Sequence, residues 1–387
     1  MNIEHSQHDR LIENEFPFSS DYTFLNHAAV SPWPRRTAKA VQRFADENVH
    51  TGPVFYPRWM AVEEKLRQQL CELINAPSAD DIALLKNTSE GLSMVAYGID
   101  WCAGDNVVSS NQEFPSNRIV WESLKDQGVT LREANIEVEM GPEAALEALC
   151  DENTRLMAIS SVQYATGLAV DLARLGRFCR ANDILFCIDG IQSIGALQMD
   201  VQAIEADFVI ADGHKWMMAP EGLALFYCRA ECRDQLRLRQ FGWHMLEKPA
   251  DFDQRDWSPA LSARRFECGS PNMLGIHGMS ASIGLLLEAG MPVIEAQVCA
   301  GGGYLAEHLK NMDGVSICAE HTRRGGIVAF RHSEITVEIL FEHLQKHNII
   351  CAVRAGAIRF AAHFYTHQTL LDHALESVEE ILLLKKR

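Results

Sequence analysis

The stretch 206-ADFVIADGHKWMMAPEGLALFYC-228 places a single lysine, Lys215, between two short apolar runs. Runs of this length and composition, bounded by Gly and Pro, are typical of buried strands. An ammonium group beside a buried strand is costly, because loss of water disfavours the charge and lowers the pKa. A lysine of lowered pKa is a nucleophile that can condense with an aldehyde. Taken alone, Lys215 could also be a solvated turn lysine.

The sequence ahead of Lys215 repeats this layout. Short apolar runs alternate with longer helical patterns, and the runs lie at 81–87, 105–111, 155–162 and 184–190. Such alternation predicts a mostly parallel sheet between helices. From residue 291 onward the order changes to a long helical stretch, a strand, a helix, a strand and a final helix. We therefore expect an α/β protein with a large domain and a smaller C-terminal α/β domain.

The expected domain limits follow from this change of layout and from ordinary domain sizes. We expect an N-terminal arm at 1–20 and a large cofactor-binding domain at 21–290, whose N-terminal segment contributes to the small domain. The small C-terminal domain is expected at 291–387.

The composition argues against several classes of partner. The 35 Lys and Arg residues against 52 Asp and Glu residues give a net charge of -17, which repels nucleic acid and anionic membranes. The 11 cysteines show no CxxC pair and no Cys/His ligand spacing, so we expect free thiols and no metal site. The first residues contain no basic segment followed by an apolar core, so we expect a cytoplasmic protein.

Polar residues follow the predicted strands at the edge where ligands gather in doubly wound sheets. Asp189 ends one predicted strand, and Asp212 ends the next, just before Lys215. A Schiff-base lysine with an acidic partner for the pyridinium nitrogen is the pattern of pyridoxal phosphate (PLP) enzymes, and Asp189 fits that partner. Thr88 and Ser89 open a helical run after another strand, where they could bind a phosphate or cap the helix.

Eight short motifs occur in order along most of the chain: FLNHAAVSP (24–32), NTSEG (87–91), QEFPSN (112–117), SVQYATG (161–167), DGIQSIG (189–195), DGHK (212–215), RFECGSPN (265–272) and AIRFAAHFYTH (357–367). From about Phe24 to the C-terminus, the chain resembles the class V aminotransferase family of fold type I PLP enzymes. That group includes cysteine desulfurases, isopenicillin N epimerase and, more distantly, kynureninase.

The resemblance implies a PLP cofactor and a set of site residues. Lys215 would form the Schiff base, as the internal aldimine lysine, and Asp189 would face the ring nitrogen, which makes them the catalytic pair. The remaining cofactor contacts would come from Thr88, Ser89, Phe114, Gln163, Gln192, Asp212, His214 and, across the interface of a homodimer, Ser270. The amino-acid substrate would be bound by His27, Ala29, Tyr164 and Arg359, with Arg359 holding its carboxylate.

Several of these residues have plainer interpretations. Phe114 and Tyr164 could be core aromatics, and His27 and His214 could be structural imidazoles. Arg359 could lie at the surface of its strand. A planar guanidinium nevertheless suits a bidentate carboxylate contact.

The resemblance leaves the reaction open. Related cysteine desulfurases carry a nucleophilic cysteine on a loop shortly before the substrate arginine, and the segment from Arg354 to Arg359 is too short for such a loop. Cys351 lies in an apolar run and is expected to be buried and inert. We expect an aminotransferase-like reaction, with a β-eliminating carbon–sulfur lyase or an amino-acid epimerase as alternatives. A non-catalytic PLP-fold sensor would have lost Lys215 or Arg359, and a nicotinamide enzyme would carry a GxGxxG motif.

Overall fold

The larger part of the chain surrounds a seven-stranded sheet. A computed structural model describes the chain except for residues 1–6, 18, 20, 320–324 and 386–387. The strand order is β2-β8-β7-β6-β5-β3-β4, with β2 (Ile82–Leu85), β3 (Asn106–Ser110), β4 (Thr130–Ala134), β5 (Thr154–Ser160), β6 (Leu185–Asp189), β7 (Phe208–Asp212) and β8 (Ala224–Cys228). Only β8 runs against its neighbours, because it pairs antiparallel with β2 and β7 while the other pairs are parallel. The expected mostly parallel sheet is confirmed.

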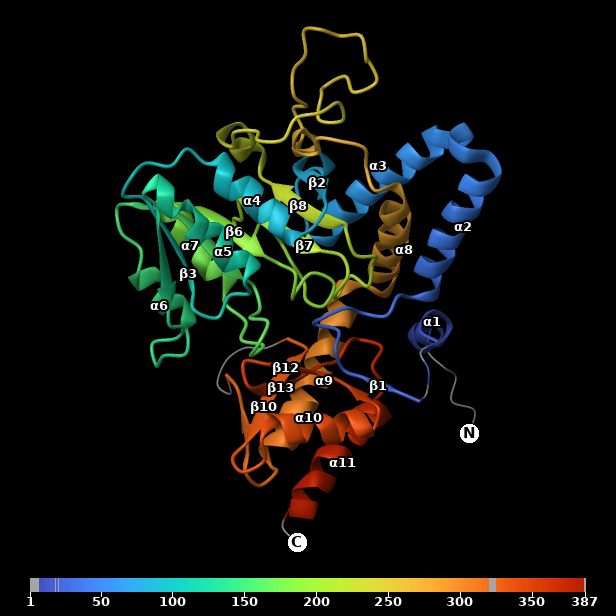
Figure 1. The fold of residues 1–387 in the computed structure, drawn as a ribbon, viewed down its shortest axis with the longest axis vertical. Coiled ribbons are helices and arrows are strands. Elements are labelled where there is room, and N and C mark those ends of the chain that lie inside the picture. Colours follow the sequence, from blue (N-terminus) through green and yellow to red (C-terminus); the bar gives the residue numbers. More distant parts are fainter. Residues whose placement is uncertain (1–6, 18, 20, 320–324, 386–387) are drawn as a thin grey trace.

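Helices cover both faces of this sheet (Figure 1), as alternating strand residues require. Ala83 and Leu85 point into the core beneath α4 (Thr88–Gly98) and α5 (Ser116–Glu122). Ile82 and Leu84 point into the opposite core, which is closed by α3 (Tyr56–Leu73), α6 (Pro142–Ala148), α7 (Leu172–Ala181) and α8 (Met273–Ala289).

Two N-terminal helices lie outside these layers. Helix α2 (Arg35–Thr51) packs along α8, and α1 (Gln7–Glu15) lies beside α2. Of the expected N-terminal arm, residues 1–6, 18 and 20 are outside the described part of the chain. Short 3₁₀ turns occur at Gly52–Phe55, Ala79–Asp81, Ser123–Gln127, Ala230–Gln235 and Ala263–Phe266.

The C-terminal part forms its own α/β layer pair, seen below the large sheet in Figure 1. Its antiparallel sheet has the order β12-β13-β10-β9 and consists of β9 (Val315–Ile317), β10 (Ile327–His332), β12 (Ala352–Arg354) and β13 (Ala357–Ala361). The helices are α9 (Met291–Lys310), α10 (Val337–Lys346) and α11 (Gln368–Lys385). Strand β1 (Thr23–Phe24) pairs with β11 (Ile349–Ile350), so the N-terminal segment packs with the small domain.

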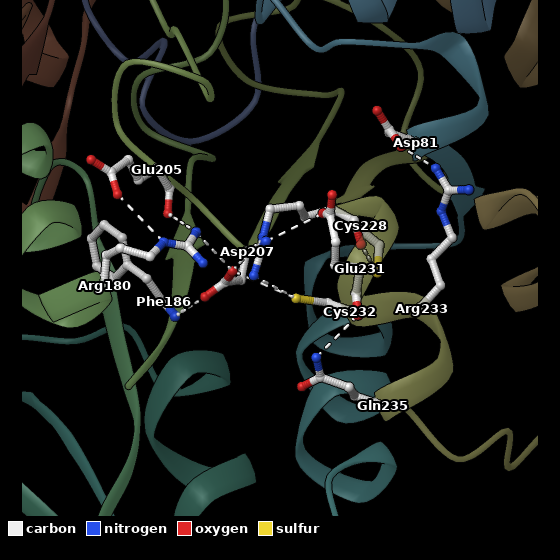
Figure 2. A network of polar contacts seen from close by, with 11 residues as sticks. Asp81, Arg180, Phe186, Glu205, Asp207, Cys228, Glu231, Cys232, Arg233 and Gln235 are labelled. Atoms are coloured by element: carbon white, nitrogen blue, oxygen red, sulfur yellow. Dashed lines mark hydrogen bonds and ion pairs between the residues drawn. The ribbon is translucent and has the colours of Figure 1, made fainter. Parts of the chain in front are cut away.

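A buried carboxylate holds together the strand ends of the large sheet that lie opposite Lys215. Asp207 accepts hydrogen bonds from the Phe186 main-chain N–H at 2.8 Å and from Arg229 Nε at 2.7 Å. Arg180 reaches the same carboxylate at 3.5 Å (Figure 2). These contacts join β6, β7 and the end of β8. They fix the register that brings the far ends of β6 and β7 side by side.

Among the described residues, no single helix is both long and apolar enough to cross a membrane. Helices α8 and α9 meet those criteria of length and composition only when taken together, and they are bent by 86° at their junction.

Candidate active site

Three ionisable groups meet at the carboxyl ends of β6 and β7. Asp189 is the last residue of β6 and pairs with Ile210, two residues before Asp212 at the end of β7. Burial lowers the pKa of Lys215 to about 8, although the charge of Asp189 opposes this effect. Burial also raises the pKa of Asp189 to about 7. The structure therefore brings the predicted catalytic pair, Lys215 and Asp189, into one desolvated site, which is incompatible with a solvated turn lysine.

Aromatic rings and a tightly held main chain frame Lys215. Its Nζ lies 5.6 Å from the centroid of the Phe114 ring. That ring meets Tyr164 edge-on at 5.1 Å and is 41% exposed, so Phe114 is not a core aromatic. The next residue, Trp216, donates its indole N–H to Gln192 at 2.9 Å, and its carbonyl lies 3.0 Å from His363 Nε2. Neither Trp216 nor His363 was among the predicted site residues.

The start of α4 lies against the end of β7. The Thr88 hydroxyl accepts a hydrogen bond from the Asp212 main-chain N–H at 3.1 Å. The side chain of Asn87 caps the helix, because it accepts a hydrogen bond from the main-chain N–H of Glu90 at 2.9 Å. Ser89 donates to Ser116 at 2.8 Å. The hydroxyls of Thr88 and Ser89 thus stand at a helix N-terminus whose first N–H groups have no partner within the helix, which suits an anion.

Glu113 is a buried residue that the sequence analysis missed. Its carboxylate accepts hydrogen bonds from the main chain of Ser160 at 3.0 Å and from Gln163 Nε2 at 2.8 Å. The bond to Gln163 fixes the amide so that Oε1 is left buried without a partner among the described residues. The motif QEFPSN contains Glu113 next to Phe114, but only the fold shows that Glu113 reaches Gln163.

Arg359 is a cation buried beside the site. It is 1% exposed, and it donates to the main-chain oxygen of Tyr164 at 2.7 Å and to Asn26 Oδ1 at 3.2 Å. Within the described residues no carboxylate pairs with it, and its Nε has no hydrogen-bond partner. Burial, and then the nearby charge of Arg354, lower its pKa to about 9. A substrate carboxylate would satisfy this guanidinium, whereas an exposed strand arginine is excluded.

His27 and Gln192 are already engaged by the protein. The His27 ring nitrogens lie 2.7 Å from the carbonyl of Ala361 and 2.8 Å from the hydroxyl of Tyr365. Burial lowers the pKa of His27 to about 4. Gln192 donates to the carbonyl of Ala28 at 3.1 Å while accepting from Trp216. Both residues hold the N-terminal segment against the site, and no ring nitrogen of His27 remains for a substrate.

Two further predicted site residues are Ala29 and Ser270. Ala29 is partly buried, and its main-chain N–H donates to the carbonyl of Asn26 at 2.9 Å. Ser270 is exposed on a loop that lines a surface groove with Lys86, Glu90 and Gln240. In the described part of the chain, no hydrogen bond or ion pair joins Ser270 to Lys215 of the same subunit.

The segment before Arg359 is closed by the shortest kind of hairpin turn. Strands β12 and β13 are joined by Ala355 and Gly356, whose φ angles of 46° and 71° match a two-residue type I′ turn. Arg331 donates to the carbonyls of both turn residues, at 2.6 and 3.1 Å. Cys351 packs in the small-domain core, and burial raises the pKa of its thiol to about 12. This hairpin therefore offers no reactive thiol.

The donor set fits a PLP group. Four buried polar atoms of this region have no hydrogen-bond partner among the described residues: Gln163 Oε1, Asp212 Oδ1, His214 Nδ1 and Arg359 Nε. His214 Nδ1 and Asp212 Oδ1 lie 3.0 Å apart without hydrogen-bond alignment. A ligand that carries a phosphate, a ring nitrogen and a ring hydroxyl, together with a substrate carboxylate, would supply the missing partners. Fold and site together define a fold type I PLP-dependent enzyme.

Comparison with known proteins gives the family. The chain belongs to the Aminotransferase class-V family, which matches residues 23–368. It is 30% identical to a probable cysteine desulfurase from Methanothermobacter thermautotrophicus, over 96% of this chain and 95% of that protein. PLP is the cofactor of this family, so the predicted cofactor is confirmed.

Solved structures share the fold. The cysteine desulfurase CsdA from Escherichia coli superposes with a TM-score of 0.87 at 20% identity, covering 98% of this chain and 99% of that one. The cystine C–S lyase C-DES, solved with its product cysteine persulfide, gives a TM-score of 0.86 at 22% identity, covering 93% and 97%. A C-DES variant with glycine covalently linked to its PLP cofactor gives 0.88. The probable cysteine desulfurase and these solved structures are named for reactions at carbon–sulfur bonds, and none of them is named an aminotransferase, the reaction that we expected from the sequence.

Proposed function

We propose that this protein is a PLP-dependent carbon–sulfur lyase that cleaves the Cβ–S bond of a cysteine-type amino acid by β-elimination. The observation that carries the proposal is the two-residue turn at Ala355 and Gly356. Related desulfurases carry their sulfur-accepting cysteine in a loop at this point, and this chain has a closed hairpin there. Its relatives act on cysteine or cystine, but sulfur would leave this site without passing to a protein thiol.

The overall reaction balances without an oxidant or reductant. The Cα–H and Cβ–S bonds break, the sulfur takes up a proton and leaves as hydrogen sulfide from cysteine, as a persulfide from cystine or as a thiol from an S-substituted cysteine, and one water hydrolyses the remaining three-carbon unit. The products are a sulfur species, pyruvate and ammonium.

The cofactor would be held by residues from four segments. Thr88, Ser89 and His214 would bind its phosphate, Phe114 would stack on its ring, and Asp189 would face the ring nitrogen. When bound, PLP supplies an electron sink for negative charge at the substrate's Cα. The carboxylate of Asp189 would keep the ring nitrogen protonated, which strengthens that effect.

The protein residues would orient the substrate and move its protons. Arg359 would bind the α-carboxylate with its free Nε and one Nη, while its bond to Tyr164 keeps the guanidinium plane fixed. Lys215 would take the proton from Cα, a role for which a pKa of about 8 is well suited near neutral pH. The same amine could then protonate the departing sulfur.

Product analysis separates the possible reactions. Purified PLP-loaded enzyme is incubated with L-cysteine or L-cystine, and pyruvate, ammonium, alanine and the chirality of residual amino acid are measured. A lyase gives equal amounts of pyruvate and ammonium. Alanine with protein-bound persulfide would instead identify a desulfurase. A keto acid formed only with an amino-group acceptor would restore the aminotransferase interpretation, and inverted amino acid would indicate an epimerase.

Chemical trapping tests the two catalytic assignments. Borohydride reduction should fix PLP on the peptide that contains Lys215, and Lys215→Ala should abolish turnover. Asp189→Ala should lower turnover far more than cofactor occupancy, because it removes the charge at the ring nitrogen. A label on another lysine, or full turnover in the Asp189 variant, contradicts the respective role.

A further inference from the structure

A cluster of metal-ligand side chains lies between α10 and α11, in the small domain. His343 lies in the last turn of α10, His347 is the residue that caps the C-terminus of this helix, and Glu380 belongs to α11. Each offers one ligand atom, and these three atoms lie within 4.8 Å of one another. His347 Nε2 lies 3.3 Å from Glu380 Oε2. Two ligands of a tetrahedral zinc ion, each about 2.0–2.1 Å from the metal, stand about 3.3 Å apart.

The helix presents both imidazoles from one face. Residues four apart on a helix are neighbours, and the rings of His343 and His347 lie 4.3 Å apart between centroids. His347 Nδ1 lies 3.0 Å from the carbonyl of His343, which can only accept a hydrogen bond, so Nδ1 is the donor and Nε2 is the nitrogen that faces Glu380. A backbone carbonyl that orients an imidazole in this way is typical of metal-binding histidines.

His343 supplies an independent indication. Its Nε2 is buried and has no hydrogen-bond partner in the described part of the chain. A buried imidazole nitrogen without a partner costs free energy, which a bound cation would recover.

Among the described residues, a second His/Glu cluster also contains a buried imidazole nitrogen without a hydrogen-bond partner, His244 Nδ1, but it differs in the charge of its surroundings. Glu63, His244 and Glu267 also bring ligand atoms together, but the guanidinium of Arg67 already pairs with both carboxylates. A metal ion there would have to displace a buried arginine. The cluster between α10 and α11 contains no such cation among the described residues.

We propose that His343, His347 and Glu380 bind one divalent transition-metal ion, of which Zn²⁺ is the best chemical match. Two imidazoles with one carboxylate suit zinc, whereas Mg²⁺ and Ca²⁺ prefer oxygen ligands alone. His347 and Glu380 are partly exposed, with side chains 34% and 54% accessible, so water can complete the coordination. The ion ties α11 to α10, both of which pack on the small-domain core.

The test uses the full-length, PLP-loaded protein after chelator treatment and dialysis, titrated with Zn²⁺ in a calorimeter. The variants are His347→Gln and Glu380→Gln. The matched control is His308→Gln, because His308 Nδ1 bonds the carbonyl four residues earlier in the same way, at 2.9 Å, at an exposed position of α9. Wild type and control should bind one zinc ion at this site. The two variants should bind it at least tenfold more weakly, since even second-shell changes cost 10- to 100-fold.

A second readout separates this site from the 11 free cysteines. Co²⁺ in place of Zn²⁺ should give ligand-field absorption without a thiolate charge-transfer band. Zinc should also raise the melting temperature of wild type and control but not of His347→Gln. Equal affinity in wild type and both variants, or a thiolate band that persists in them, overturns the proposal. Turnover on a cysteine substrate confirms that each variant is folded.

Discussion

The guanidinium of Arg359 donates to the main-chain oxygen of Tyr164 across 2.7 Å, which joins strand β13 of the small domain to the segment after β5 of the large one. In the described part of the chain, no group forms a hydrogen bond with Nε of the same guanidinium. Arg359 therefore joins the two domains at the site, and in the proposed reaction it would also present a charge to the substrate carboxylate; the two roles can be separated experimentally.

Replacing Arg359 by Lys should impair substrate use more than folding. An ammonium is a point charge and cannot reproduce a bidentate carboxylate contact, so kcat/KM should fall on the order of 10²-fold, or about 3 kcal/mol. Steady-state kinetics on L-cystine measures the effect, and PLP absorbance with thermal melting checks the fold. Unchanged kcat/KM would assign the carboxylate to another residue.

Replacing Cys351 by Ala should leave the reaction intact. The thiol is 7% exposed and packs in the small-domain core, so the change should cost about 1 kcal/mol of stability. Turnover and the pyruvate-to-alanine ratio are compared with wild type. If activity disappears while folding and PLP content survive, sulfur transfer through Cys351 must be reconsidered.

Local sequence signals predicted the strands and the order of the layers, and they singled out Lys215 and Asp189, which the structure brings together. Strand-length apolar runs locate β2, β3, β5, β6, β7 and β8, and the residues after β6 and β7 do meet around Lys215. The run at β4 was missed, because three of its five residues are polar or charged and the strand lies at a sheet edge. The glycines at 301–303 do not break α9. At Gly302 a Cβ would stand 2.7 Å from the carbonyl of Gly325, so that glycine permits close packing.

What the sequence could not predict depends on contacts between distant segments. Glu113 reaches Gln163, His363 reaches Trp216, and the nitrogens of His27 are taken by Ala361 and Tyr365. No local sequence pattern predicts such contacts between distant segments. The pair His343 and His347 has a visible spacing of four, but its third ligand, Glu380, is 33 residues further on and becomes a neighbour only when α11 packs on α10.

Removing Arg67 should destabilise the large domain strongly. Its guanidinium is buried between Glu63 and Glu267, at 2.5 Å from each, and Arg67→Met would leave both carboxylates without their cation. We expect a loss of about 3–5 kcal/mol in the free energy of unfolding by urea. Arg118→Met is the matched control, because Arg118 forms the same i,i+4 pair with Glu122 at the surface and should change stability by less than about 0.5 kcal/mol. Similar losses in both variants would contradict this account.

A homodimer should be required for full activity. The resemblance assigns Ser270 to the partner's phosphate site, and the neighbouring loop exposes the large apolar side chains Phe241, Phe252, Trp257 and Leu261, which a second subunit could cover. Mixing Lys215→Ala with Ser270→Ala subunits should create one intact site per heterodimer and raise activity above that of either variant alone. No gain after subunit exchange, or a fully active monomer in sedimentation, argues against the shared site.

Because the imidazole of His27 is buried, the free energy of unfolding should decrease as the pH falls below 7. Burial lowers the pKa of His27 to about 4 in the folded protein, against 6.5 for an ordinary histidine. Between these values the unfolded chain binds more protons than the folded one, so the contribution is complete above about pH 6.5 and is lost as the pH falls toward 4. The difference corresponds to about 3 kcal/mol.

Urea unfolding between pH 7 and pH 4.5 tests this account. The free energy of unfolding should decrease less with falling pH for His27→Gln than for wild type, although the variant is less stable than wild type at pH 7. Exposed His50, changed to Gln, should leave the wild-type slope unaltered. If His27→Gln keeps that slope as well, the acid sensitivity comes from other groups, of which His363, whose pKa burial also lowers well below its usual value, is the next to test.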